Sequence, residues 1–406
     1  MHGPRALDTQ RLVVPSLLLA LTGLALEALN VARGHRLGLD FDVYRAAGNS
    51  VLHGASVFDP ALSSSMRHPL PFTYPPLAAL FAVPFALVGN RVGFALWDAV
   101  SVVALLFVVR VTAQPFLRRQ TRPVLALTLA VLVALALTPV VAALDLGQVG
   151  IPLMALCLFD CVLERPRLPR GVMIGIATAV KLLPGIFIPY LWLTGRRRAA
   201  ATATAVFAGC SLATFAFLPR DSHVFWTSRV FDNSRVGRIT YFTNQSLYGM
   251  ARRAFGAHTG LVLALWVPVA VVVVGFGLRH AVLASRRGQE LLGISMTALV
   301  GVLVSPVSWV HHLVWIVPVL AVLIGDTTDR RRVTLAVSIA AFFALRLPYL
   351  ANSIPPGWGF AWLAGPLKDS YGLTCLALLF ALPRLVIPMS SRAEPRRPAP
   401  AVPPSS

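Results

Sequence analysis

The sequence predicts an all-α polytopic membrane protein, and three observations lead to this fold class. Hydrophobic residues make up 56% of the 406 residues and charged residues only 13%, with a mean hydropathy of +0.72, whereas an average soluble domain carries about 25% charged residues. Apolar runs long enough for the hydrocarbon layer, about 17 to 25 residues, recur from residues 12–32 to residues 371–389, and arginines cluster between them. We expect a single transmembrane domain over residues 1–389 and a disordered, proline-rich cytoplasmic tail over residues 390–406.

The arginine clusters predict the topology, because short loops rich in Lys and Arg stay in the cytoplasm. The first apolar run, residues 12–32, is longer than a signal-peptide core of about 7 to 15 residues and lacks a small-residue cleavage site, so we expect a retained helix. With six arginine-rich segments on one side, the crossings between them must come in pairs. Both termini are then cytoplasmic.

The requirement for paired crossings decides how two segments are placed that could either cross the membrane once or not. Residues 76–88 would form a helix of roughly 20 Å, which is short of the hydrocarbon thickness, so they are expected to be re-entrant or to lie at the interface. Residues 171–195 have arginines at both ends and Lys181 and Pro184 in the middle, which favours two short limbs that turn near the outer face. About twelve crossings result, near residues 12–32, 92–112, 123–143, 148–164, 171–182, 184–195, 199–218, 260–281, 291–305, 309–325, 333–350 and 371–389.

The charge and the cysteines exclude two function classes. The formal net charge is +20, but the arginines lie at the ends of apolar segments, where they set topology, so nucleic acid is not an expected partner. The cysteines have neither paired nor metal-ligand spacing and lie in apolar segments, which is typical of buried small side chains and not of redox chemistry; they are Cys157, Cys161, Cys210 and Cys375.

Residues capable of specific chemistry concentrate on the predicted outer side. The cytoplasmic loops hold mostly arginine, whereas the outer ends hold most of the other polar residues. A functional site is therefore expected on the outer, periplasmic face of the plasma membrane. The segments that contribute to it are residues 40–74, 145–148, 181, 220–258, 305–312 and 349–368.

The first outer loop begins DFDVYRAAGNSVLHG, in which apolar residues repeat at helical spacing. This pattern predicts a short helix at the membrane surface with Asp40 and Asp42 at its start. One aspartate is expected to cap the helix. Because one helix needs only one cap, Asp42 is the expected cap and Asp40 the candidate catalytic base.

Candidate binding residues follow in the same loop and in the hairpin. His68 and Tyr74 lie in the stiff, proline-rich stretch MRHPLPFTYPP; His68 is a candidate for contact with a phosphate or a sugar, although the prolines alone can shape a turn. Lys181 is one of only two lysines among 36 lysines and arginines. A lysine in an apolar hairpin indicates either an anionic head-group site or snorkelling to the interface.

Two later outer segments add further candidates. The loop of residues 220–258 holds six arginines that topology does not explain, and these are expected to contact outer-leaflet lipid phosphates or an acidic acceptor. Asn244 and Gln245 offer donors and acceptors that suit sugar hydroxyls, or form a polar turn. His311 and His312 are adjacent on a predicted helix, so they cannot both chelate one metal, and one of them is expected to face the site.

These residues favour one reaction class over two others. A single outer carboxylate with nearby cations suits sugar transfer from a phosphate-linked donor, where a base takes the acceptor proton and positive charge holds the leaving phosphate. A lipid or anion transporter is the alternative, supported only by acidic residues within the predicted bundle. A purely structural scaffold does not explain the polar outer face.

Six segments in order along the chain resemble glycosyltransferase family 87, the polyprenyl-phosphate-mannose-dependent mannosyltransferases of actinobacteria. The resemblance covers most of residues 36–325. The segments read DFDVYRAAGNSVLHGASVFDP, LPFTYPPLAALFAVPFAL, LDLGQVGIPLMALCL, GVMIGIATAVKLLPGIFIPYLWL, TNQSL and SPVSWVHHLVWIVPVL.

The resemblance implies a GT-C fold, inversion at the anomeric carbon, a polyprenyl-phosphate-mannose donor and no obligatory metal or other cofactor. The expected acceptor is a glycolipid or lipoglycan of the phosphatidylinositol mannoside or lipomannan type, joined by an α-1,2 linkage. The family also includes arabinofuranosyltransferases that use a decaprenyl phosphate donor, so the sugar stays open. By position, the resemblance puts the family's catalytic aspartate at Asp40, its lysine at Lys181, and its histidine pair at His311 and His312.

Overall fold

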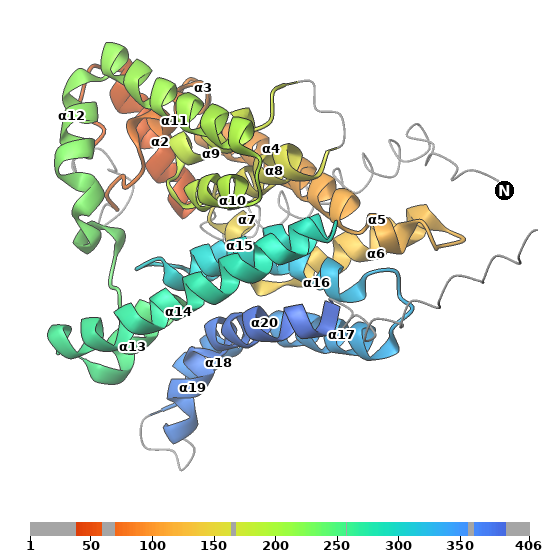
Figure 1. Cartoon of the computed structure of the whole chain (residues 1–406). Coiled ribbons are helices and arrows are strands. Elements are labelled where there is room, and N and C mark those ends of the chain that lie inside the picture. The colour runs from red at the N-terminus through yellow and green to blue at the C-terminus, as the bar shows by residue number, and fades with distance from the viewer. Residues whose placement is uncertain (1–37, 59–69, 164–167, 257, 356–360, 387–406) are drawn as a thin grey trace, which may run out of the picture.

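The computed structural model describes residues 38–58, 70–163, 168–256, 258–355 and 361–386 (Figure 1). Within these ranges the chain forms α-helices and 3₁₀-helices without a sheet, apart from one isolated antiparallel bridge between Asn244 and Trp309. The predicted all-α class is confirmed. The predicted first crossing and the predicted C-terminal tail lie outside the described residues.

Most of the predicted apolar segments form helices in the structure. In chain order they are α2 (Leu39–Leu52), α3 (Pro76–Ala86), α4 (Asn90–Thr112), α5 (Gln114–Leu117), α6 (Pro123–Ala136), α7 (Thr138–Asp145), α8 (Gly150–Val162), α9 (Val172–Val180), η2 (Leu183–Ile186), α10 (Phe187–Leu193), α11 (Arg197–Phe217), α12 (Pro219–Thr227), η3 (Arg229–Phe231), η4 (Asn233–Val236), α13 (Leu247–Phe255), α14 (Thr259–Arg286), α15 (Glu290–Val304), η5 (Val310–Trp315), α16 (Ile316–Ile324), α17 (Arg330–Ala344), α18 (Leu347–Asn352), η6 (Ala361–Leu363), α19 (Ala364–Lys368) and α20 (Ser370–Val386).

Several helices have the length and composition of membrane spans. Among the described residues, α4, α11 and α14 are long and apolar enough to cross a membrane, and α6 with α7, bent by 73°, makes a fourth if the pair is one span. Large apolar side chains on α11 and α14 stand exposed, including Phe217 at 71% and Val271 at 66%. Such apolar surface is stable against lipid and costly against water. The fold is that of a membrane protein, while the count of twelve crossings stays a prediction.

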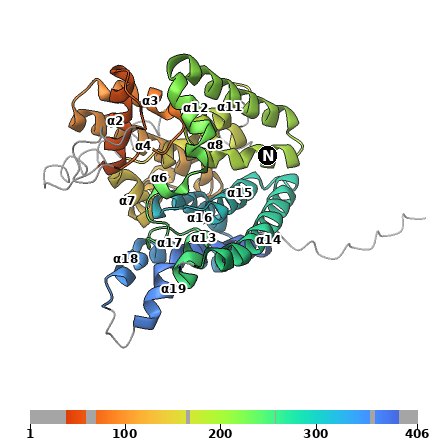
Figure 2. The same ribbon diagram turned by 90° about the vertical axis from the view of Figure 1, so that its left-hand side faces the viewer.

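The two ends of the molecule differ in character. Figure 1 shows α2, α12, α13, α18 and α19 at one end, on the left, and α5, α6 and α17 at the other. The connections at the second end are rich in arginine, and an Arg119–Asp326 ion pair of 2.9 Å joins two of them. Figure 2 looks onto the first end, where α2 and α12 lie on one side and α13, α18 and α19 on the other.

The segment 171–195 turns back on itself, as predicted. The N-terminal end of α9 lies against the start of α11, because a Cβ on Gly171 would meet the carbonyl oxygen of Ala199. The chain then breaks at Lys181, whose backbone is extended, and α10 returns it to Arg197, where α11 begins. Pro184 is the second residue of the 3₁₀-helix η2 at the break, where its missing N–H leaves no unpaired donor.

The segment 76–88 forms α3, which packs closely on α2. Gly48 makes the contact possible, since a Cβ there would lie 2.7 Å from the backbone carbon and oxygen of Ala82. Helix backbones approach this closely only where one side lacks a Cβ. Through this contact α3 fixes both α2 and the chain at Tyr74 that leads into α3.

Replacing Gly48 by alanine is expected to destabilise the α2–α3 contact by about 1–3 kcal/mol, because the added methyl group overlaps the backbone at Ala82. The measurement is the thermal unfolding midpoint of the detergent-solubilised protein. Gly209→Ala is the matched control, since Gly209 also lies in a helix but a Cβ added there would have nothing within 4 Å. A midpoint for Gly48→Ala equal to that of the control would contradict the close contact.

Candidate active site

A cavity of about 780 Å³ opens at the end of the molecule that carries α2 and α12. Its walls come from the start of α2, the chain at residues 70–75, the break after α9, residues 235–243 and the segment before and within η5. Five of the nine predicted site residues line it: Asp40, Tyr74, Lys181, His311 and His312. The structure therefore brings these five residues, which are far apart in the chain, to one cavity.

Asp40 is positioned by the docking of α2 onto the turn that follows α7. The first backbone N–H groups of a helix have no partner within the helix. Here Asp40 N and Phe41 N donate to the carbonyl of Leu146 at 3.0 and 3.1 Å. Gly147, with φ +69°, permits the approach because a Cβ there would lie 2.6 Å from that of Phe41. The docking brings Gln148 beside the Asp40 carboxylate.

Gln148 links Asp40 to two tyrosines. Its Nε2 donates to Asp40 Oδ2 at 2.5 Å, and its Oε1 lies 3.2 Å from the hydroxyls of both Tyr44 and Tyr74. The two hydroxyls are 2.8 Å apart. Gln148 and Tyr44 both lie in segments that were expected to contribute to the site, but neither was singled out from the sequence, although Tyr44 follows Asp40 by four residues and so lies on the same face of α2.

Burial raises the pKa of Asp40 above its ordinary value, and the Gln148 hydrogen bond and the Lys181 charge partly oppose this effect. A carboxylate with a raised pKa takes up a proton more readily, which suits a general base. Burial also raises the pKa of Tyr44 and that of Tyr74. Both hydroxyls are therefore neutral donors at pH 7.

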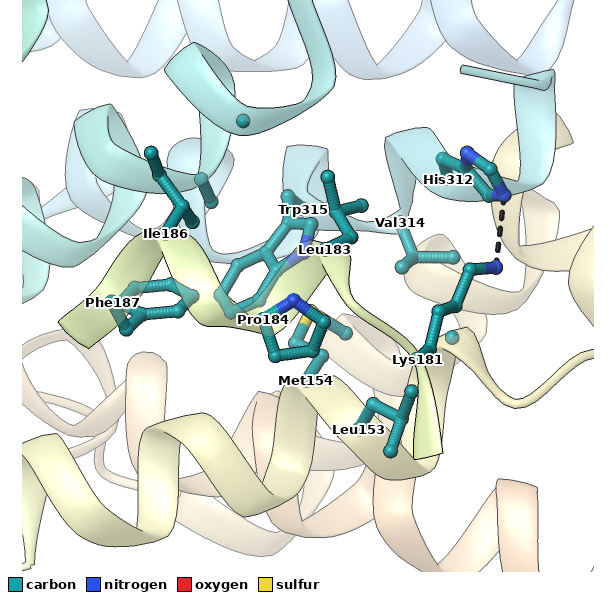
Figure 3. Close-up of a pocket in the computed structure, with 13 residues that line it drawn as sticks. Leu153, Met154, Lys181, Leu183, Pro184, Ile186, Phe187, His312, Val314 and Trp315 are labelled. Carbon is teal, nitrogen blue, oxygen red and sulfur yellow. Dashed lines mark hydrogen bonds between the residues drawn. The ribbon is translucent and has the colours of Figure 1, made fainter. Parts of the chain in front are cut away.

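Lys181 lies on the opposite side of the same hydrogen-bonded group. Its Nζ lies 2.9 Å from Nε2 of His312, and it donates to the Tyr74 hydroxyl at 3.3 Å. The dashed line in Figure 3 marks the contact between Lys181 and His312. The ammonium also lies 5.1 Å from the centre of the Tyr74 ring. An ammonium can only donate, so Nε2 of His312 accepts and its ring carries its proton on Nδ1.

The carboxylate and the ammonium are connected without touching. Within the described ranges no ion pair of 4.0 Å or less joins Asp40 to Lys181; the neutral side chains of Gln148 and Tyr74 stand between them. A direct ion pair would neutralise both groups. Their separation leaves the carboxylate and the ammonium able to act on different parts of one bound substrate.

Both histidines border the cavity, whereas only one was expected to face it. The predicted α-helix at this point is a 3₁₀-helix, η5, and the two ring centres lie 4.7 Å apart at 80°. His312 is held by Lys181, while Nε2 of the buried His311 has no hydrogen-bond partner in the described part of the chain.

Two arginines of the long outer loop also reach this cavity. Arg235 donates to the carbonyl of Phe72 at 3.3 Å and lies 5.5 Å from the centre of the Phe58 ring, and Arg238 borders the cavity beside Tyr241. They add positive charge to the wall of the cavity.

A narrow apolar pocket of about 30 Å³ continues from Lys181 and His312 between η2 and η5 (Figure 3). Apolar side chains of both elements border it, including Phe187 and Trp315, whose ring centres are 5.3 Å apart. The Lys181 ammonium therefore lies where the larger cavity meets this apolar pocket.

Asp42 does not have the role expected from the sequence. The residue that precedes α2 is Gly38, and no side chain caps the helix. The Asp42 carboxylate instead accepts a hydrogen bond of 2.8 Å from Nδ2 of Asn90, and Asp42 does not border the cavity. Its contact joins α2 to α4. Of the remaining candidates, His68 lies outside the described residues.

Asn244 and Gln245 lie behind the cavity wall, not in it. Asn244 is fully buried; its Nδ2 donates to the carbonyls of Ile239 and Pro306, and its Oδ1 accepts from Ser308 N at 2.9 Å. Gln245 is occupied in the same way by backbone groups, including the carbonyl of Lys368 at 2.7 Å. Their amides hold the loops together, so the expected contact with sugar hydroxyls is not found.

Metal independence remains a prediction. Over the residues described, no group of three His, Cys, Asp or Glu side chains is arranged to hold a metal ion.

The fold and the cavity define a helical membrane protein with a partly buried carboxylate and a partly buried ammonium that border one cavity. The family model for glycosyltransferase family 87 matches residues 72–306, which is more than half of the chain. The chain belongs to glycosyltransferase family 87.

Several mycobacterial proteins are similar over most of their length. A polyprenol-phosphate-mannose-dependent alpha-(1-2)-phosphatidylinositol mannoside mannosyltransferase of Mycolicibacterium smegmatis is 34% identical, over 76% of this chain and 74% of that protein. The protein of the same description in Mycobacterium tuberculosis is 32% identical, over 76% and 75%. A phosphatidylinositol pentamannoside mannosyltransferase of M. tuberculosis is 30% identical, over 88% and 84%. No solved structure matches the chain.

Replacing Asn244 by alanine is expected to lower the stability of the protein by about 1–3 kcal/mol, because buried backbone groups at Ile239, Pro306 and Ser308 lose their partner. The thermal unfolding midpoint in detergent measures this loss. At a temperature where the variant stays folded, its KM for sugar substrates should equal that of the wild type. A raised KM with an unchanged midpoint would instead put Asn244 in contact with substrate.

Proposed function

We propose that this protein transfers mannose from a polyprenol phosphate donor to a phosphatidylinositol mannoside, forming an α-1,2 linkage with inversion at the anomeric carbon. The observation that carries the proposal is the pair of opposite charges on one cavity, Asp40 and Lys181, kept apart by Gln148 and Tyr74. The names of the mycobacterial relatives supply the donor, the sugar and the acceptor class.

The chemistry of this transfer needs one base and one cationic site. Asp40 takes the proton from the acceptor hydroxyl as its oxygen forms a bond to the anomeric carbon of mannose. On the opposite face of the sugar, the bond from that carbon to the phosphate oxygen breaks, and the phosphate leaves with the electron pair. Lys181 stabilises the added negative charge, and His312 holds the ammonium in place.

No general acid is required at the leaving group. A glycoside hydrolase needs a second carboxyl group to protonate a poor leaving oxygen. A polyprenol phosphate leaves as a stable anion, so an ammonium suffices. This matches the cavity, where the charged side chains that accompany the Asp40 carboxylate among the described residues are cations: Lys181, Arg235 and Arg238.

The proposed arrangement in the membrane is a GT-C architecture with about twelve crossings, both termini in the cytoplasm and the cavity at the periplasmic face. The opposite placement of the arginine-rich connections and the cavity supports this orientation, because Lys and Arg are retained on the cytoplasmic side. The isoprenoid tail of the donor would then lie along the apolar helices within the bilayer.

Asp40→Asn is expected to lower mannose transfer by roughly 10²–10⁴-fold, because the amide cannot accept the acceptor proton. The assay uses purified protein in detergent with polyprenol phosphate-mannose, a phosphatidylinositol mannoside and a chelator. Asp42→Asn is the matched control and should retain activity, since Asp42 does not border the cavity. Equal losses in the two variants would remove Asp40 from the role of base. A decaprenol phosphate-arabinose donor tests the alternative sugar.

Gln148→Met is expected to move the acidic limb of the pH–rate profile to higher pH. The base must be ionised, so activity is lost as the pH falls through the pKa of Asp40, which burial raises above its ordinary value. The Gln148 hydrogen bond favours the ionised form and lowers this pKa, so its removal raises the pKa further. kcat/KM measured against pH checks the shift. A uniform loss of rate at every pH would indicate that Gln148 only supports the structure.

A further inference from the structure

A second cavity, of about 750 Å³, adjoins the first at the same end of the molecule. Its lining comes from the long outer loop, α13, α18 and α19, the group of elements on the lower side in Figure 2. Arg238 and Tyr241 border both cavities. The two cavities therefore share a boundary at these two residues.

Arg253 and Asp369, which border the second cavity, form an ion pair with each other. Nε of Arg253 donates to Asp369 Oδ1 at 2.7 Å, and its two terminal nitrogens donate to the carbonyls of Tyr241 and Asn244 at 2.8 and 2.7 Å. The side chains of Arg253 and Asp369 are only 13% and 18% exposed. This pair forms part of the wall, and each of the three guanidinium nitrogens already donates a hydrogen bond to the protein.

Two further cations border the same cavity without such partners. In the described part of the chain, no hydrogen bond or ion pair of 4.0 Å or less engages the Lys368 ammonium or the Arg238 guanidinium, although their loops are held in place. The backbone carbonyl of Lys368 accepts from Gln245 at 2.7 Å, which fixes the lysine at the rim. Three cations and one carboxylate leave the cavity with an excess of two positive charges.

The two lysines of the chain are divided between the two cavities: Lys181 borders the first and Lys368 the second. Elsewhere every basic side chain other than histidine is an arginine. A compact ammonium suits a phosphate oxygen, so each cavity has its own phosphate-binding group. A transfer between two lipid-linked substrates involves two phosphates, one on the donor and one on the acceptor.

We propose that the second cavity binds the phosphodiester of the acceptor glycolipid, with Lys368 and Arg238 as its ligands. This inference rests on the proposed function and deepens it by assigning one phosphate to each cavity. The acceptor's sugar would pass over Arg238 and Tyr241 into the first cavity, where its hydroxyl meets Asp40. The exposed ring of Tyr241 offers a flat surface to that sugar.

Lys368→Gln tests the proposal with two acceptors, a phosphatidylinositol mannoside and a neutral alkyl mannoside that has no phosphate. Loss of one charge-assisted hydrogen bond should raise KM for the phosphate-containing acceptor by about tenfold. KM for the donor and transfer to the neutral acceptor should not change. Lys368→Arg, which keeps the charge, should restore most of the affinity.

Arg220→Gln is the matched control, because Arg220 is an exposed arginine of the same outer region that borders neither cavity. Its KM values should equal those of the wild type. The thermal unfolding midpoint of each variant establishes that the fold is intact. An equal rise in KM for both acceptors, or no rise for either, would overturn the proposal.

Two further measurements distinguish acceptor binding in the second cavity from binding of bulk anionic lipid and from a failure of the proposed function. Phosphatidylglycerol added to the micelles should leave the acceptor KM of the wild type unchanged; if it raises that KM to the value of Lys368→Gln, the cavity binds bulk anionic lipid and the proposal fails. Absence of mannose transfer to either acceptor by folded wild-type protein would sink the proposed function itself. Transfer by the wild type with an unaltered Lys368→Gln variant would sink only the second site.

Discussion

The hydrogen bonds that dock the first turn of α2 onto the turn after α7 determine the rest of the candidate site. They satisfy helix N–H groups that would otherwise be unpaired, and they set Gln148 beside Asp40. Gln148 in turn orders the hydroxyls of Tyr44 and Tyr74, and Tyr74 receives the ammonium of Lys181. A displacement of α2 would therefore change the carboxylate and the cationic side of the cavity together.

The cationic side depends on irregular backbone at two places. Lys181 stands at the break between α9 and η2, and His312 stands in the 3₁₀-helix η5 that precedes α16. In a continuous helix, the helical repeat would set the direction of each side chain. The breaks free Lys181 and His312 from this repeat, so that both can reach the same cavity. Within the apolar part of a membrane protein, such breaks are tolerated where the backbone borders a cavity or is buried in protein. The two breaks meet at the cavity, which explains their location.

Local spacing and the cost of charge in an apolar segment were enough to predict α2, the hairpin at Lys181 and the candidate base Asp40. The positions of three other residues depend on contacts that no local pattern carries. Asn244 has the chemistry to bind a sugar, but backbone groups, including those of Pro306 and Ser308, occupy its amide. Gln148 shows the reverse case, since its importance comes from a carboxylate 108 residues away in sequence. Asp42 is of a residue type that often caps helices, but its carboxylate accepts a hydrogen bond from Asn90 of α4.

The restriction of lysine to two positions has a practical consequence for chemical labelling. Reagents that acylate primary amines find only Lys181, Lys368 and the chain's amino terminus, because a guanidinium does not react under the same conditions. Lys181 is enclosed beside His312, and Lys368 stands at the rim of the neighbouring cavity. Mass spectrometry of the acylated protein would thus report the occupancy of each cavity separately, without any substitution in the chain.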